Sequence, residues 1–207
     1  MLDQAIFFDK DGTLLEDVPY NVEPRLMRLA PRAGEALRRL APHYRLIVIS
    51  NQSGVAHGYF DESALFGVEQ RLRELLVTHD VELGGFYYCP HHPQGQVSAY
   101  RLVCDCRKPR PGMIKRAAAE KGIDLARSWM VGDILDDIEA GRLAGCRTVL
   151  IDNGGETEWV RSVNRRPDFT ASDLHVAAEW ILAQPEIGDP STRGSAVACS
   201  PTDFGAP

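Results

Sequence analysis

The chain has 207 residues, of which 44% are hydrophobic and 25% are charged, as is typical of one globular domain. The net charge of −6 argues against a nucleic-acid partner, because phosphate backbones bind basic surfaces. No apolar run approaches the roughly 20 residues that a membrane-spanning helix needs, and the first residues lack the basic and apolar regions of a signal peptide. We therefore expect a cytoplasmic, monomeric protein that binds neither nucleic acid nor membranes.

Apolar runs alternate with stretches of helical spacing along the chain. The first half predicts a strand over 5–8, a helix over 32–41, a strand over 46–49, a helix over 61–79 and a strand over 85–88. The second half predicts a helix over 112–121, a strand over 129–131, a helix over 135–144, a strand over 148–151 and a helix over 173–183. Asp61 is expected to cap the second helix, and Pro111 suits the first turn of the third.

This alternation predicts an α/β fold, a Rossmann-like parallel sheet with helices on both faces. We expect a single domain over residues 1–185. Beyond Ala183 the chain is rich in Pro, Ser, Gly and Thr and poor in apolar residues. Residues 186–207 are therefore predicted to be a disordered tail.

Polar side chains follow three of the predicted strands. The first strand ends in Asp9-Lys10-Asp11-Gly12-Thr13, the second in Ser50-Asn51-Gln52-Ser53-Gly54, and the fourth in Gly132-Asp133. The carboxyl ends of parallel strands meet at one edge of the sheet, where ligands bind in open α/β folds. We therefore expect these polar groups to form one ligand site.

The acidic turn after the first strand has three interpretations. Asp-Gly between apolar runs is common in simple turns. A calcium loop is excluded, because Leu14 stands where that loop requires glycine. In the third interpretation, one carboxylate attacks phosphorus while the other handles the leaving-group proton, beside a divalent ion held by the carboxylates.

The pattern Asp9-x-Asp11-Gly12-Thr13 resembles the first motif of the haloacid dehalogenase-like (HAD) phosphatases. Their other motifs follow in order at Ser50-Asn51, Lys108-Pro109 and Gly132-Asp133. The resemblance covers roughly residues 4–183 and implies an enzyme with the HAD fold. It also implies Mg²⁺ as the catalytic cofactor.

The resemblance assigns a role to each matching residue. It implies that Asp9 is the nucleophile and a magnesium ligand, and that Asp11 is the general acid and base, with its backbone carbonyl on the metal. Asp133 is implied as a direct magnesium ligand. Ser50 and Lys108 would stabilise charge on the transferring phosphoryl group. Beyond the motif, we expect Asp137 to orient the lysine or a water, and Asp136 to be an ordinary surface charge.

Three of the five cysteines crowd into residues 89–106. Cys89-Pro90-His91 and Cys104-Asp105-Cys106 offer three thiolates and one imidazole, the ligand set of a structural Zn²⁺ site. Disulfides are disfavoured because Cys104 and Cys106 are too close in sequence for relaxed bridging and the expected compartment is reducing. Buried cysteines without a metal, or His92 as ligand in place of His91, remain alternatives. A zinc loop here would hold the chain that leads into Arg107 and Lys108.

The spacing of the motifs limits the size of any cap domain, and two loop sequences indicate the class of substrate. About 36 residues separate Thr13 from Ser50, which leaves no room for a large cap domain. The stretches 50–59 and 89–109 resemble the capless, zinc-loop D-glycero-D-manno-heptose 1,7-bisphosphate 7-phosphatase family. That resemblance implies removal of the C7 phosphate in the synthesis of nucleotide-activated heptose, as used in lipopolysaccharide. Ser50 and His57 depart from the Thr and Arg that are common in that family. Ser50 keeps the hydroxyl, so the chemistry is expected to be unchanged, and His57 is expected to alter one substrate contact.

A sugar bisphosphate needs a second anion contact and hydroxyl contacts. Arg107 is our candidate for the second phosphate, because a guanidinium binds phosphate in a bidentate manner. The other expected substrate contacts lie on loops near the motifs or belong to them: Asp17, Tyr20, Asn21, Ser50, Asn51, Gln52, Ser53 and Lys108.

Three alternatives stay open. A histidinol-phosphate phosphatase would keep the mechanism and change the substrate. A nucleic-acid 3′-phosphatase conflicts with the acidic net charge. A non-catalytic zinc-loop binding module would lack the nucleophile or the lysine, yet Asp9 and Lys108 are both present.

Overall fold

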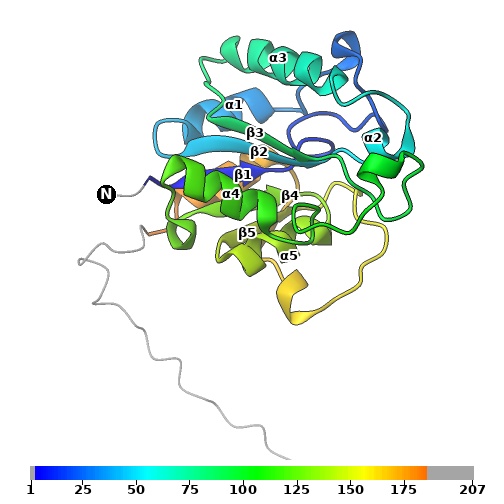
Figure 1. Ribbon diagram of the computed structural model, residues 1–207. Helices are drawn as coiled ribbons and strands as arrows, with labels where there is room; N and C mark the ends of the chain where they lie inside the picture. Colours follow the sequence, from blue (N-terminus) through cyan, green and yellow to red (C-terminus); the bar gives the residue numbers. More distant parts are fainter. Residues whose placement is uncertain (1–2, 186–207) are drawn as a thin grey trace, which may run out of the picture.

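The fold is built around one parallel β-sheet. The computed structural model describes residues 3–185 (Figure 1). Six strands pair in the order β3-β2-β1-β4-β5-β6, and every pair is parallel. The strands are β1 Ala5–Phe8, β2 Arg45–Asn51, β3 Gly85–Cys89, β4 Trp129–Gly132, β5 Arg147–Ile151 and β6 Phe169–Ala171. The predicted parallel sheet is therefore confirmed.

The helices are α1 Ala33–Leu40, α2 Gly54–His57, α3 Ala64–Val77, α4 Gly112–Lys121, α5 Leu135–Ala144 and α6 Leu174–Leu182. Five of them match predicted helices. The four-residue α2 and the three-residue edge strand β6 were missed, because neither is long enough to show a periodic pattern. The predicted cap of α3 was wrong: Asp61 contributes only its backbone carbonyl, which accepts from Ala64 N at 2.9 Å, and α3 begins three residues later.

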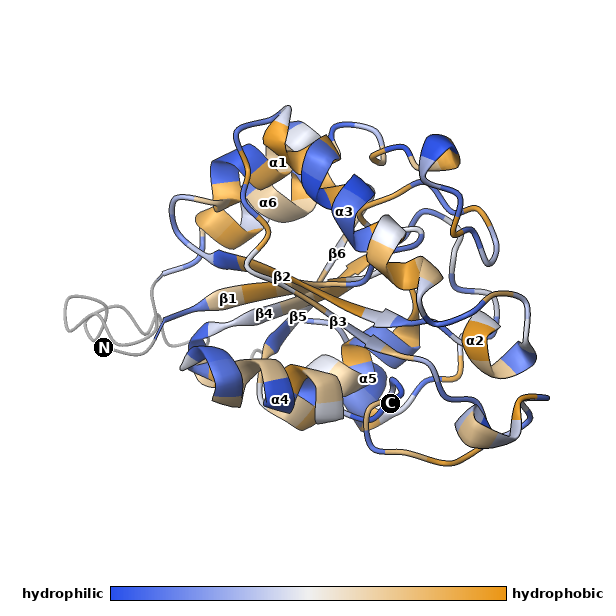
Figure 2. Ribbon diagram, turned by 45° about the horizontal axis from the view of Figure 1, so that its top comes forward, coloured by the Kyte–Doolittle hydropathy of each residue, from blue (hydrophilic) through white to orange (hydrophobic). Residues whose placement is uncertain are grey.

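Side chains of β1 alternate between the two faces of the sheet. Ile6 and Phe8 pack in one core with α1, α3 and α6, whereas Ala5 and Phe7 pack in another with α4 and α5. Figure 2 shows the sheet as the middle layer between these two groups of helices. Because both faces are buried, β1 is apolar throughout, and each fully buried phenylalanine contributes about 1.5–3 kcal/mol.

The connections after β1 and β2 are too short to hold a separate domain. Between β1 and β2 the chain forms only a 3-10 turn, Pro24–Leu26, and α1; between β2 and β3 it forms α2 and α3. Among residues 3–185 there is thus no inserted cap domain, in agreement with the expected capless arrangement. The predicted tail, residues 186–207, lies outside the described residues. None of the described helices has the length and apolar character needed to cross a bilayer.

The segment after β3, residues 89–106, folds against α2 (Figure 1). The backbone N–H groups of Gln96 and Val97 both donate to Ala56 O, at 2.7 and 2.9 Å. Gly95 sits directly against Ala56, and a Cβ on Gly95 would lie 2.7 Å from the Ala56 carbonyl oxygen. This close approach fixes the loop at the carboxyl edge of the sheet, where the first two polar motifs also lie.

Candidate active site

The sequence motifs meet where the strand order reverses. β1 lies between β2 and β4, so the residues that follow these three strands share one edge of the sheet. Asp9 N donates to Val131 O at 2.9 Å, which continues the β1–β4 pairing by one residue beyond β1. The turns that carry Asp9, Ser50 and Asp133 are thus neighbours, as expected from the sequence.

A buried lysine joins two carboxylates at the centre of this edge. Lys108 Nζ pairs with Asp9 Oδ1, lies 2.6 Å from Asp137 Oδ1, and donates to Ile49 O at 2.9 Å. The side chains of Lys108 and Asp137 are 2% and 0% exposed. Burial by itself lowers the pKa of Lys108, but Asp137 and Asp9 outweigh it and raise that pKa above its ordinary value. The lysine therefore carries a full positive charge in this site.

Three buried carboxylates crowd together beside the lysine. Oxygens of Asp9, Asp133 and Asp137 all lie within 4.8 Å of one another. Burial raises the pKa of Asp9 to about 8, against the opposing charge of Lys108 and with help from the neighbouring carboxylates. Burial and Asp137 raise the pKa of Asp133 to about 7. These raised pKa values mean that burial and the neighbouring carboxylates disfavour the ionised forms of Asp9 and Asp133. A hard divalent cation such as Mg²⁺ bound to these oxygen donors would balance the charge and keep both groups ionised.

The turn after β1 brings its backbone against Asp133. Gly12 has φ of +81°, and a Cβ at that position would lie 2.8 Å from Asp133 Cγ. Thr13 Oγ1 donates to Asp133 Oδ1 at 3.1 Å, and Asn153 Nδ2 donates to Gly12 O at 2.6 Å. Glycine is needed here both for the left-handed backbone and for the close approach. Asn153 was missed by the sequence analysis, because nothing in its local pattern connects it to the first motif.

Asp11 lies apart from the three crowded carboxylates. Its carboxylate accepts from Lys10 Nζ at 2.6 Å and from Gln52 Nε2 at 3.2 Å. The Asp11 side chain is 34% exposed, so it faces the opening of the site. Gln52 Nε2 also donates to Ser50 Oγ at 2.7 Å, which links the second motif to the first. A carboxylate at this opening is placed to exchange a proton with a bound molecule.

Asn51 bonds to the backbone of Lys108. Its Nδ2 donates to Lys108 O at 3.1 Å, and its Oδ1 accepts from Lys108 N at 3.0 Å. Both polar atoms of this predicted substrate contact are thus engaged in holding the lysine segment against the end of β2. Ser53 is half-buried, while Asp17 and Tyr20 are exposed on the loop after β1.

The predicted zinc residues form a compact cluster. The Sγ atoms of Cys89, Cys104 and Cys106 lie 3.1–3.5 Å apart, and His91 Nδ1 lies 3.3 Å from Cys106 Sγ. The four ligand atoms all lie within 4.8 Å of one another. The structure brings His91, and not His92, into this cluster. Three sulfurs and one ring nitrogen in such a group suit tetrahedral Zn²⁺.

Arg107 lies between this cluster and the lysine. Its Nη1 donates to His91 O at 3.4 Å, and within residues 3–185 no carboxylate lies within ion-pair distance of its guanidinium. Arg107, Lys108 and His92 line a cavity of about 410 Å³. An anion that enters this cavity beside Lys108 would meet the guanidinium, and also the Asp136 carboxylate, which pairs with Arg165 at 2.6 Å.

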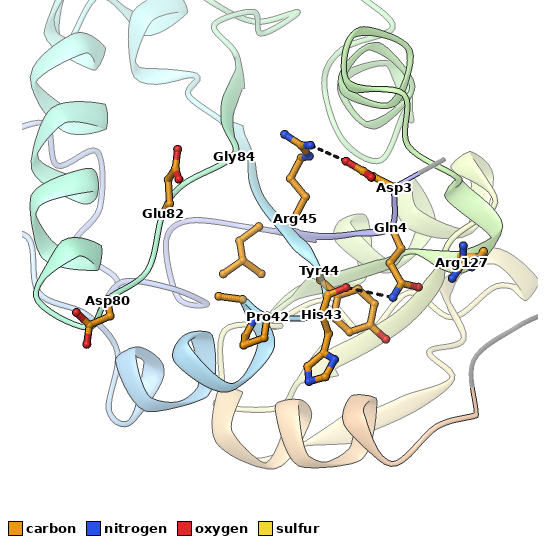
Figure 3. Close-up of a pocket in the computed structure, with 12 residues that line it drawn as sticks. Asp3, Gln4, Pro42, His43, Tyr44, Arg45, Asp80, Glu82, Gly84 and Arg127 are labelled. Carbon is orange, nitrogen blue, oxygen red and sulfur yellow. Dashed lines mark hydrogen bonds and ion pairs between the residues drawn. The ribbon is translucent and has the colours of Figure 1, made fainter. Parts of the chain in front are cut away.

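A second hollow, of about 600 Å³, opens at the opposite edge of the sheet (Figure 3). Two pairs of its polar groups contact one another: Arg45 Nη2 lies 2.5 Å from Asp3 Oδ2, and Gln4 Nε2 donates to His43 O at 3.1 Å. It lies at the amino ends of β1, β2 and β3, away from the crowded carboxylates. Although it is the larger hollow, the chemistry of the site is at the carboxyl edge.

Comparison with known proteins identifies the family. A family model described as HAD-hydrolase-like matches residues 105–177. A D-glycero-beta-D-manno-heptose-1,7-bisphosphate 7-phosphatase of Salmonella typhi is 38% identical over 179 residues, covering 86% of this chain and 89% of that protein. The chain belongs to this phosphatase family. It is accordingly a HAD-like phosphoric monoester hydrolase.

Two further members of the heptose bisphosphate phosphatase family show the same relationship. The enzyme of that name from Pasteurella multocida is 42% identical over 153 residues, covering 73% of this chain and 83% of that protein. The crystal structure of D,D-heptose 1,7-bisphosphate phosphatase from B. bronchiseptica, complexed with magnesium and phosphate, superposes with a TM-score of 0.69. It is 29% identical and covers 86% of this chain and 98% of that chain. The HAD fold and the family inferred from the motifs are thus confirmed.

Proposed function

We propose that this enzyme hydrolyses the C7 phosphate of D-glycero-D-manno-heptose 1,7-bisphosphate to give heptose 1-phosphate, a step toward nucleotide-activated heptose. The observation that supports phosphate hydrolysis is the buried group of Asp9, Lys108 and Asp133 at the carboxyl edge of the sheet. The choice of substrate is supported by the relatives of that name, which are 38% and 42% identical to this chain.

Asp9 and Asp11 divide the covalent chemistry between them. In the first step a carboxylate oxygen of Asp9 attacks phosphorus, and the bond from phosphorus to the C7 oxygen breaks as Asp11 gives its proton to that oxygen. In the second step Asp11 takes a proton from a water that attacks the aspartyl phosphate. Inorganic phosphate leaves, and both residues return to their starting states. The half-exposed position of Asp11 suits this exchange with sugar and water.

Lys108 and Ser50 stabilise the phosphoryl group as it transfers. The lysine is held by Asp9, Asp137 and Ile49 O, so its charge is fixed in place before the substrate arrives. Ser50 Oγ accepts from Gln52 Nε2, which leaves its own hydroxyl hydrogen for a phosphoryl oxygen. Preorganised donors of this kind contribute more to the transition state than mobile ones.

Mg²⁺ would be held by the side chains of Asp9 and Asp133 and by the backbone carbonyl of Asp11. The crowding of buried carboxylates around one lysine supports this assignment, because a divalent cation would neutralise the excess charge. When bound, Mg²⁺ supplies positive charge to the oxygens of the transferring phosphoryl group. Asp137 is engaged with Lys108 and with Ile134 N, so we assign it to orienting the lysine.

Zn²⁺ would be held by Cys89, His91, Cys104 and Cys106 and would have a structural role, because all four ligand positions come from the protein. The loop that it closes runs directly into Arg107 and Lys108. Arg107 is proposed to bind the second phosphate. The sugar hydroxyls are assigned to the loops that carry Asp17, Tyr20, Asn21, Gln52 and Ser53 around the opening, whereas Asn51 acts through the Lys108 backbone that it holds.

The test is phosphate release from the α and β anomers of heptose 1,7-bisphosphate and from histidinol phosphate, each with Mg²⁺ and with EDTA. We expect Mg²⁺-dependent turnover of one heptose anomer with at least about tenfold higher kcat/KM than the other substrates. Preference for histidinol phosphate would overturn the substrate and keep the mechanism. Turnover that persists equally in EDTA would overturn the metal assignment.

A further inference from the structure

His92 is the second histidine of the 89–106 loop, and the cysteine cluster does not use it. Its backbone is fixed, because His92 N donates to Tyr100 O at 3.1 Å. Its side chain is half-buried and lines the same cavity of about 410 Å³ as Arg107 and Lys108. A polar ring on the wall of that cavity is available to whatever occupies it.

A backbone hydrogen bond determines which ring nitrogen of His92 carries hydrogen. Gln94 N donates to His92 Nδ1 at 3.2 Å. A nitrogen that accepts a hydrogen bond carries no hydrogen of its own, so the ring hydrogen lies on Nε2. His92 therefore presents a single N–H donor, at the far end of its ring.

A row of rings begins at the side chain of His92. His57 lies against it with ring centroids 4.7 Å apart, Tyr59 stacks on His57 at 5.5 Å, and Tyr20 meets Tyr59 at 4.8 Å. These rings come from three separate segments: the loop after β1, the end of α2, and the 89–106 loop. The contact with His57 and the hydrogen bond at Nδ1 together limit the rotation of the His92 ring and so the direction of its donor.

We infer that His92 donates its Nε2 hydrogen to the second phosphate of the substrate, beside the Arg107 guanidinium. The inference rests on the proposed function, since it adds a residue to the phosphate contact assigned there to Arg107. A charged partner and a neutral donor on one cavity wall match the several oxygens of a phosphate. His92 would then favour sugar bisphosphates over sugar monophosphates.

Two amide substitutions test the position of the donor. In His92→Gln, the terminal amide nitrogen reaches about as far as Nε2, whereas in His92→Asn the shorter amide can replace only the Nδ1 acceptor. The measurement is the ratio of kcat/KM for heptose 1,7-bisphosphate to kcat/KM for heptose 7-phosphate. We expect His92→Asn to lower this ratio about tenfold or more and His92→Gln to keep it within about threefold of wild type.

A binding measurement gives an independent readout. Heptose 1-phosphate keeps the second phosphate and lacks the one that is hydrolysed, so its affinity reports on this contact without turnover. By isothermal titration in the presence of Mg²⁺, His92→Asn should weaken its binding about tenfold, and His92→Gln should not.

The outcomes separate this inference from the proposed function. A wild-type enzyme with no Mg²⁺-dependent release of phosphate from the heptose bisphosphate would overturn the proposed function itself. If the wild type is active and His92→Asn keeps both the wild-type kcat/KM ratio and the wild-type affinity for heptose 1-phosphate, the role of His92 is overturned and the proposed function is not. Equal losses in the Asn and Gln variants would also overturn it, because the donor would not be at Nε2.

Discussion

The ammonium group of Lys108 lies 2.6 Å from the carboxylate of Asp137, and the side chain of Asp137 is completely buried. Lys108 follows the cysteine cluster, whereas Asp137 lies in the first turn of α5. Asp137 Oδ2 also accepts from Ile134 N at 3.3 Å, so one carboxylate both caps the helix and holds the lysine. The ion pair therefore fixes the position of the loop relative to the sheet.

Asp137→Asn removes the negative charge and keeps an oxygen for the helix cap. We expect kcat to fall on the order of tenfold to hundredfold, because Lys108 loses one of the two carboxylates that hold it. The matched control is Glu139→Gln two residues further along α5, whose side chain is partly exposed and pairs with Arg165 at 2.6 Å. Steady-state phosphate release checks both variants. Equal losses in the two would show that Asp137 has no special role.

Asp9→Asn should reduce turnover by at least about a thousandfold, because an amide cannot form the covalent phosphoryl intermediate. The control is Asp152→Asn, an exposed carboxylate just beyond the end of β5 at the same edge of the sheet. We expect the control to retain activity within about twofold. Trapping of labelled phosphate on the protein should succeed with wild type and fail with Asp9→Asn; label on the variant would exclude Asp9 as nucleophile.

Cys104→Ser should lower the zinc content, as measured by elemental analysis. It should also lower the unfolding free energy by roughly 3–5 kcal/mol. Activity should fall with it, since Arg107 and Lys108 directly follow the cluster. Cys146→Ala is the comparison, because Cys146 is buried against α4 and α5 and lies outside the cluster. It should keep a full complement of zinc. A Cys104→Ser protein with unchanged metal content would contradict the ligand assignment.

Gly12→Ala and Gly154→Ala separate backbone strain from steric conflict. Both glycines have positive φ, +81° and +93°. A Cβ at Gly12 would lie 2.8 Å from Asp133 Cγ, whereas a Cβ at Gly154 would have no atom within 4 Å. Each variant should lose about 1 kcal/mol of unfolding free energy from strain.

Only the Gly12 variant should also lose activity, by on the order of a hundredfold, because Asp133 must move. Apparent affinity for Mg²⁺ should weaken with it. Circular dichroism melts and phosphate release against Mg²⁺ concentration check the pair. A Gly12→Ala enzyme with wild-type kinetics would mean that the close approach of Gly12 to Asp133 does not matter.

Cys146 provides a pH-dependent prediction. Burial raises the pKa of its thiol to about 12, from an ordinary value of 9.0. Between these values the unfolded chain has released the proton and the folded chain has kept it, so stability is lost as pH rises above about 9. Cys146→Ala lacks this group. The unfolding free energy of wild type, relative to Cys146→Ala, should therefore decrease between pH 8 and pH 10; a constant difference would contradict a buried neutral thiol.

The strands and most helices were predictable because each carries a local pattern. The apolar runs of β1 and β2 follow from burial on both faces, and the helical spacing of α1 and α5 follows from burial of one stripe. The start of α3 was predicted wrongly, since a capping residue type at Asp61 indicates a helix start without fixing it. β6 pairs only with β5, so its strand character depends on a neighbour distant in sequence.

By itself, the sequence determined the order of the motifs, the grouping of three cysteines with a nearby histidine, and the edge of the sheet where the site must lie; the structure then placed His91, and not His92, in that group. These depend on residue type and spacing, which are local. Only the tertiary structure decided that Asp137 contacts Lys108, that Asn51 holds its backbone, and that His92 shares a cavity with Arg107. Such contacts join segments tens of residues apart, and they form only when the sheet and its loops bring those segments within hydrogen-bonding distance.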